Sequence, residues 1–158
     1  PGVEKGNVVD VPDVLKGREF GAKIVVASRG FVGAEIALFL SAKGKSVVLL
    51  EASEDIAADI GPMNRMRLKE ALKRNNVDTR CGAELLGVAE KRVTVRDGGG
   101  QYELEMDAVV LALGATSRQS LLRELEGKVE QVLGIGDCVE PRNMIEAIHE
   151  GYGVALKL

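Results

Sequence analysis

The chain has 158 residues, a formal net charge of −3, and only three Phe, two Tyr and no Trp. It therefore lacks the basic field and the stacking surfaces that nucleic-acid binding needs. All of its apolar runs fall short of the roughly 18 residues that cross a bilayer, so we expect no membrane partner. Cys81 and Cys138 are too far apart to form a metal or redox motif, and we expect a cytoplasmic protein.

Residues 23–51 have the pattern of one β-α-β unit. The β-branched run at 23–27 predicts a buried strand, apolar spacing predicts a helix over 32–43, and a second strand is expected at 46–50. Two strands connected in this way lie side by side and parallel. Residues 1–20 show no strand and helix pair of their own, so we expect them to be a linker from a missing upstream part.

The remaining elements follow with a change in periodicity. Helices are expected at residues 63–75, 120–126 and 144–158. Strands are expected at residues 77–81, 84–88, 92–96, 102–106, 108–113 and 131–135. The alternation over 84–106 predicts an antiparallel β-meander, and the apolar run at 108–113 predicts a return to the parallel sheet. The sequence therefore predicts an α/β, Rossmann-like three-layer fold: a parallel sheet with helices on both faces, plus the meander.

The turn after the first strand carries the candidate cofactor site. Its residues are Ser28, Arg29, Gly30, Phe31, Val32 and Gly33. They spell the dinucleotide-binding pattern G-x-G-x-x-G with serine in place of the first glycine. Gly30 would let the backbone approach a pyrophosphate, and Gly33 would let helix and strand pack closely, while the helix start would offer N–H groups. Glu51 would bind the adenosine ribose and repel a 2′-phosphate, which favours NAD over NADP.

Ser28 is the departure from this pattern. A Cβ there would cost about 1–3 kcal/mol if φ is positive, so we expect weakened binding that survives. Arg29 either pairs with phosphate or is a solvated loop charge. The acidic Glu35 is favoured at the helix start by the helix dipole alone. In the alternative, purely structural interpretation, the glycines only allow close packing of helix and strand in a domain without a ligand.

Three separated motifs carry a family resemblance: GFVGAE followed by Glu51, LALGATSR, and GIGDCVEPRNMIEAIHEGY. Together they resemble the C-terminal NAD(P)-binding region, of the glutathione-reductase type, in the NADH:flavin oxidoreductase and 2,4-dienoyl-CoA reductase family. The resemblance implies an NAD-binding domain over 21–116. It also implies that 117–158 return to an incomplete FAD-type domain.

The resemblance also implies roles for single residues. The turn at 28–33 would hold the NADH pyrophosphate and Glu51 its ribose, Glu35 would lie near the nicotinamide, Gly114 would approach the cofactor, and Asp137 would bind FAD. The FAD domain's own glycine turn, an FMN-bearing barrel and iron–sulfur cysteines would precede Pro1.

The expected function is to position the nicotinamide of NADH for hydride transfer to FAD, as one domain of a flavin-dependent oxidoreductase. The chain alone would not complete turnover. Two alternatives stay open: a non-catalytic Rossmann-like domain that has lost its nucleotide, and a binder of an adenine nucleotide or FAD. Residues 131–158 would pack on the core, pack on a second copy as a homodimer, or stay loose.

Overall fold

A computed structural model describes residues 1–157, and they divide into two compact units. The N-terminal unit is Pro1–Leu113 and the C-terminal unit begins at Gly114. The helices of the described residues are all too short or too polar to cross a lipid bilayer.

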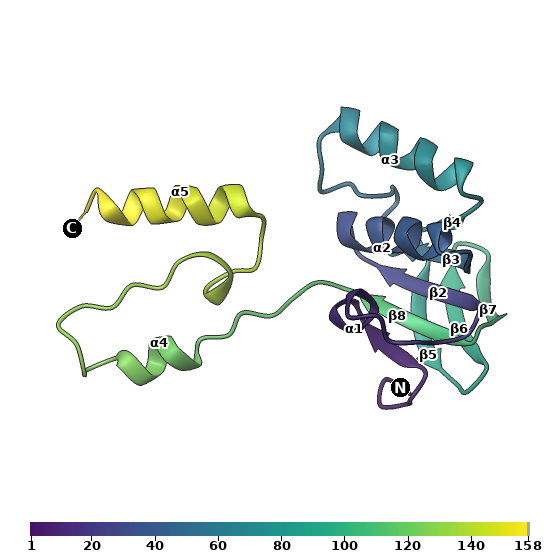
Figure 1. The fold of residues 1–158 in the computed structure, drawn as a ribbon, viewed down its shortest axis with the longest axis horizontal. Helices are drawn as coiled ribbons and strands as arrows, with labels where there is room; N and C mark the ends of the chain where they lie inside the picture. The colour runs from purple at the N-terminus through teal and green to yellow at the C-terminus, as the bar shows by residue number, and fades with distance from the viewer. Residues whose placement is uncertain (158) are drawn as a thin grey trace. The chain divides into compact units, whose positions relative to one another are not determined.

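A five-stranded parallel sheet forms the centre of the N-terminal unit (Figure 1). Its strands, in spatial order, are β1 (Val8–Asp10), β8 (Ala108–Ala112), β2 (Lys23–Ser28), β3 (Ser46–Glu51) and β4 (Asp78–Cys81). The central position of β2 agrees with its sequence, because Ile24 through Ala27 are all at most 2% exposed. The β-branched run is therefore buried on both faces, as predicted.

One face of this sheet is covered by helices. These are α1 (Val11–Leu15), α2 (Phe31–Ala42) and α3 (Pro62–Arg74). Ile24 and Val26 of β2 share a buried cluster with Leu40 of α2 and Leu72 of α3. The apolar spacing predicted from the sequence thus faces the sheet.

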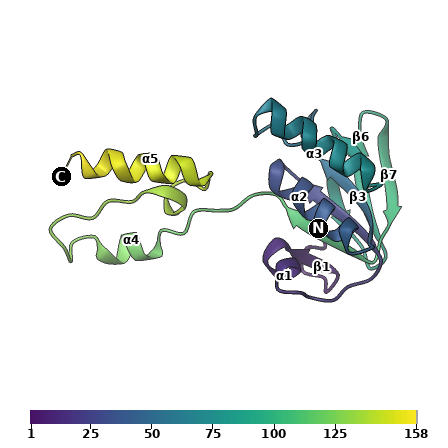
Figure 2. The same cartoon turned by 45° about the horizontal axis from the view of Figure 1, so that its top comes forward.

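The other face is covered by a second, antiparallel sheet (Figure 2). Its strands are β5 (Glu84–Val88), β6 (Arg92–Asp97) and β7 (Gly100–Glu105). Val93 and Val95 of β6 are fully buried in one cluster with Val25 of β2. The α/β fold class with a meander is confirmed. The second face, however, carries the meander where a helix was expected, because β6 offers an apolar side of its own.

The expectation for residues 1–20 is wrong in one respect, since they do form a strand and a helix. β1 pairs in parallel with β8, and Val9 and Val14 are buried in the core. Asp10 caps α1 by accepting a hydrogen bond from the Asp13 N–H at 2.8 Å. Three strand residues and five helical ones are too few to show a periodicity, so tertiary pairing decides here.

The C-terminal unit consists of α4 (Ser120–Leu125), a 3₁₀ turn η1 (Gly136–Cys138) and α5 (Met144–Ala155). The strand expected at 131–135 is wrong: these residues join neither sheet. A strand needs a neighbour to accept its backbone hydrogen bonds, and this run has none among the described residues. Leu158, the expected end of the last helix, lies outside the described residues.

Candidate functional site

The glycine turn lies where β2 ends and α2 begins. Ser28 is the last residue of β2 and is paired with Glu51 of β3 on one side and Ala112 of β8 on the other. The Arg29 N–H donates to the Ala112 carbonyl oxygen at 3.3 Å. The turn is thus built on the carboxyl ends of three neighbouring parallel strands, where α/β sheets bind their ligands.

Ser28 is not strained, contrary to the concern raised by its Cβ. It has strand geometry, and the left-handed φ of +126° falls on Gly30 instead. Within the described residues, only Ala57 and Asn76 are non-glycine residues at positive φ. The serine is tolerated because the position that needs glycine is Gly30, two residues later.

Gly33 has the predicted packing role. A Cβ built on Gly33 would lie 2.2 Å from the Ser28 Oγ and 2.4 Å from the Ser28 Cβ. No carbon can approach these atoms so closely, so α2 approaches β2 only because Gly33 has no side chain.

Glu51 is bound into the turn by three hydrogen bonds. One carboxylate oxygen accepts from the Ser28 hydroxyl at 2.8 Å and from the Gly30 N–H at 3.0 Å. The other accepts from the Ser53 N–H at 3.0 Å. Glu51 is 0% exposed, so a ribose could reach this carboxylate only after the turn rearranges. Its role as the ribose acceptor stays a prediction.

Asp59 is the residue that the sequence reasoning missed. Its two carboxylate oxygens lie 2.9 and 3.2 Å from the Phe31 nitrogen, whose N–H they accept. A Cβ on Gly30 would lie 2.8 Å from the Asp59 Oδ2. The carboxylate therefore occupies the space that Gly30 leaves bare. No spacing rule distinguishes Asp59 from the nearby Glu54, so this contact has no signal in the sequence.

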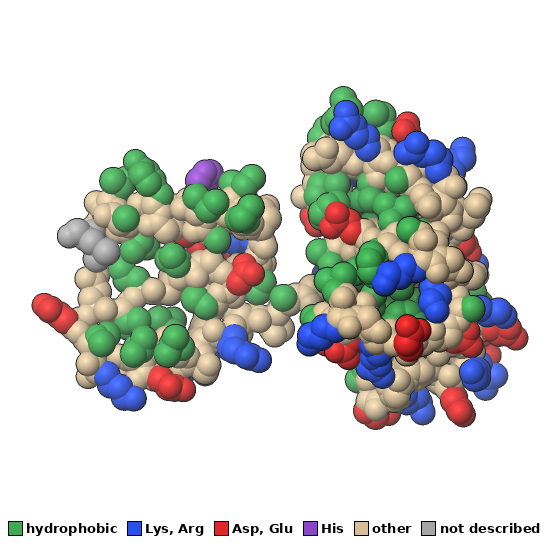
Figure 3. All heavy atoms as spheres, viewed as in Figure 1, with side chains coloured by type: hydrophobic (Ala, Val, Ile, Leu, Met, Phe, Trp, Pro, Cys, Tyr) green, Lys and Arg blue, Asp and Glu red, His purple; other side chains and the backbone are tan. Residues whose placement is uncertain are grey.

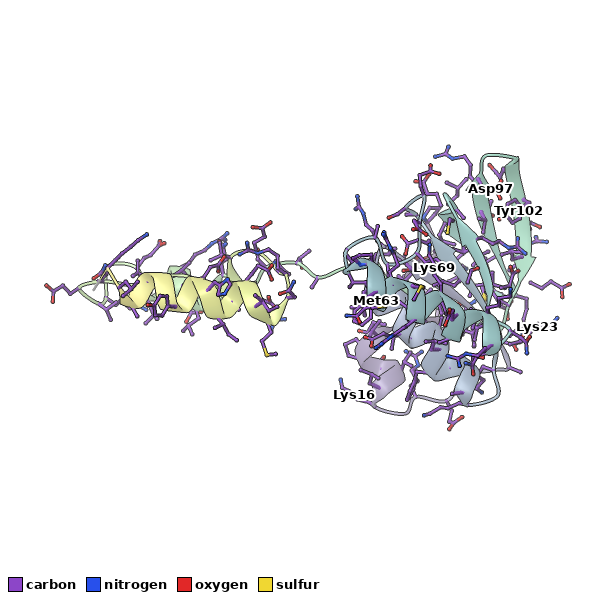
Figure 4. All side chains as sticks on the ribbon, turned by 90° about the horizontal axis from the view of Figure 1, so that it is seen from above. Lys16, Lys23, Met63, Lys69, Asp97 and Tyr102 are labelled. Carbon is purple, nitrogen blue, oxygen red and sulfur yellow. The ribbon has the colours of Figure 1, made fainter. Side chains whose placement is uncertain are left out.

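The loop that carries Asp59 connects β3 to α3 and is held at two points. Ile56 and Ala57 are buried, and Ala57 has a φ of +50°. Asp55 pairs with Arg65 at 3.6 Å and with Lys69, which Figure 4 labels on α3. The hydrogen bond from Lys69 lowers the pKa of Asp55. These contacts fix the first part of the loop, whereas Asp59 itself is exposed.

The other predicted residues around the turn are open to solvent. The side chains of Arg29, Val32 and Glu35 are exposed, and Phe31 is half-buried. Val32 and Glu35 project from the first turns of α2. They are thus available to a ligand at the start of α2.

Gly114 and Asp137 belong to the C-terminal unit. Gly114 begins that unit with a φ of +105°. Asp137 is exposed in η1, where its carboxylate accepts the Arg142 N–H at 3.3 Å. The structure brings residues 28–33 and Glu51 together, and it leaves these two residues as predictions.

The turn suits an anion, as its own contacts demonstrate. Two consecutive backbone N–H groups, those of Gly30 and Phe31, each bind a carboxylate. The first turn of a helix leaves N–H groups without intrahelical partners and carries a partial positive charge. A diphosphate would find the Phe31 N–H and the space beside Gly30 that lacks a Cβ, whereas the Gly30 N–H is directed to the buried Glu51.

Comparison with known proteins identifies the family of the chain. A family model described as pyridine nucleotide-disulphide oxidoreductase matches residues 1–151. The metal reductase of Desulforamulus reducens is 32% identical over 98% of this chain and 28% of its own length. The NADH oxidase of Thermoanaerobacter brockii is 31% identical over 99% of the chain and 25% of its own length.

Solved structures give the same result. A 2-naphthoyl-CoA reductase complex superposes with a TM-score of 0.90 at 26% identity, covering 99% of this chain and 24% of that one. Histamine dehydrogenase from Rhizobium sp. 4-9 has the same fold, with a TM-score of 0.86 at 20% identity over 96% of this chain and 26% of its own. The chain thus spans about a quarter of the length of these relatives. With a family model matching nearly its whole length, the chain belongs to the pyridine nucleotide-disulphide oxidoreductase family.

Proposed function

We propose that the N-terminal unit binds NADH and positions its nicotinamide for hydride transfer to an FAD held elsewhere in a longer parent protein. The relatives whose names denote reductases and an NADH oxidase support a redox role. Within the family, we propose that the parent protein belongs to the dienoyl-CoA reductase-like group of NADH:flavin oxidoreductases and carries FMN and an iron–sulfur cluster as well. In this proposal, residues from 117 onward complete the FAD-type domain.

One observation carries the proposal: the Phe31 N–H at the start of α2, beside the bare Gly30, already holds the exposed Asp59 carboxylate. A nucleotide would place its diphosphate there. The exposed Arg29 would pair with a phosphate oxygen, and the exposed Glu35 would face the nicotinamide end. When bound, NADH supplies a hydride and FAD accepts it; the protein groups bind and orient.

Titration of the purified chain with NADH and with NADPH, followed by nicotinamide fluorescence, tests this proposal. We expect saturable binding of NADH and weaker binding of NADPH, because the loop around Glu51 is acidic. The absence of an NADH signal up to millimolar concentration would contradict the proposal. Tighter binding of NADPH would contradict the role given to Glu51.

A second candidate function, a Rossmann-like domain that no longer binds nucleotide, is favoured by the burial of Glu51. Its carboxylate is fully engaged by Ser28, Gly30 and Ser53, so the turn is stable without a ligand. A third candidate function is the binding of an adenine nucleotide or FAD. ADP binding without nicotinamide fluorescence changes, or a yellow preparation with flavin absorbance, would identify that case.

A further inference from the structure

The Asp59 carboxylate lies where the proposed function places a phosphate. It accepts the Phe31 N–H with both oxygens, at 2.9 and 3.2 Å. It also fills the bare side of Gly30, where a Cβ would be 2.8 Å from the Asp59 Oδ2. The Asp59 carboxylate and a phosphate oxygen would compete for the Phe31 N–H. Two anions that share one donor also repel each other.

The geometry of the loop permits Asp59 to leave while its anchor stays. Ile56 and Ala57 are buried and Asp55 is paired with Arg65 and Lys69. After Asp59, Ile60 packs against the core and its N–H donates to the Ala57 carbonyl oxygen at 3.2 Å. Ala58 and Asp59 between these anchors are exposed, so the Asp59 side chain can turn away from Phe31 without moving them. Ala57 holds a left-handed φ of +50° at the junction between the two parts. A non-glycine residue keeps such a conformation only when its surroundings impose it.

We propose that Asp59 is a built-in competitor of the nucleotide: its carboxylate closes the glycine turn in the free domain and must be displaced when a diphosphate binds. This inference rests on the proposed function and adds its regulation. The apparent affinity is then lower than the intrinsic affinity of the open turn by the fraction of molecules in which Asp59 is away. The same contact caps α2, whose own N-cap residue, Gly30, makes no side-chain hydrogen bond.

The test compares NADH binding to the wild-type chain and to Asp59→Ala by isothermal titration calorimetry. We expect Asp59→Ala to bind NADH about tenfold more tightly, which corresponds to about 1.4 kcal/mol. Asp59→Asn keeps a neutral acceptor for the Phe31 N–H and should fall between the two. It also carries the test alone if loss of the cap prevents Asp59→Ala from folding, which thermal unfolding will show.

Glu54→Gln is the matched control, because it removes one negative charge from an exposed position of the same loop. We expect its NADH affinity to stay within twofold of wild type. Tightening by Glu54→Gln equal to that of Asp59→Ala would overturn the inference, since it would reflect charge alone. Equal NADH affinity of wild type and Asp59→Ala would also overturn it and leave the proposed function standing. If neither protein binds NADH, the proposed function itself fails, and the competitor with it.

Discussion

The two units of the molecule reach order by different means. Every buried apolar side chain among the described residues lies in the N-terminal unit. In the C-terminal unit, Ile145, Ile148 and Tyr152 of α5 are 60–68% exposed, and Figure 3 shows hydrophobic side chains on its surface. Polar contacts hold that unit: the Gly136 N–H donates to the Glu150 carboxylate at 2.6 Å. Regular helices therefore form in both units, but only one has a core.

Core truncation should separate the two units most strongly. Leu49→Ala removes a fully buried side chain of β3 and should lower the free energy of unfolding by about 3 kcal/mol. Ile148→Ala, on the exposed face of α5, should change it by less than about 0.5 kcal/mol. Urea unfolding followed by circular dichroism measures both. An equal loss at Ile148 would mean that the C-terminal unit packs against something in solution.

Replacing one glycine in α2 and one in α5 compares a helix packed on a core with a helix that lacks one. Gly33→Ala would place a Cβ 2.2 Å from the Ser28 Oγ and should cost about 2 kcal/mol in unfolding free energy. Gly153→Ala on α5 meets nothing within 4 Å and should stabilise by up to about 1 kcal/mol, because alanine favours helix.

Adding Ser28→Gly to Gly33→Ala completes a double-mutant cycle. The serine side chain is the obstacle, so the double variant should recover most of the loss. Additive losses would show that the crowding comes from the backbone of the turn.

The smallest expected effect concerns the polar contacts of the C-terminal unit. Glu150→Ala removes the acceptor of the Gly136 N–H and should speed hydrogen exchange of that amide about fivefold, equivalent to about 1 kcal/mol. Glu124→Ala, an exposed acid on α4, serves as the control and should leave this rate unchanged. An unchanged rate in Glu150→Ala would indicate that another contact holds the turn at Gly136.

Sequence reasoning succeeded where pattern is local and continuous. The predicted bounds of β2, α2 and β3 lie within one residue of the observed bounds. A buried strand, a turn with glycine and a helical apolar spacing follow one another between residues 23 and 51, so the pattern is continuous. Sequence reasoning failed where pairing in space decides: β1 is only three residues long, and the apolar run at 131–135 has no partner strand.

The backbone of the glycine turn was predicted from the sequence, whereas its side-chain contacts were not. The spacing of Gly30 and Gly33 identified the turn, since both are required by local geometry. The engagement of Glu51 by Ser28, and of Phe31 by Asp59, joins residues more than twenty positions apart. Such contacts depend on where a loop returns, which no local periodicity encodes.

The burial of Glu51 has a consequence for cofactor engineering. Attempts to convert such a domain to the phosphorylated coenzyme would begin by replacing the acid at the end of β3. Here that change would leave the N–H groups of Gly30 and Ser53 without their hydrogen-bond acceptor, Glu51. A design that instead introduces a basic side chain at the exposed Ala52 leaves this support intact.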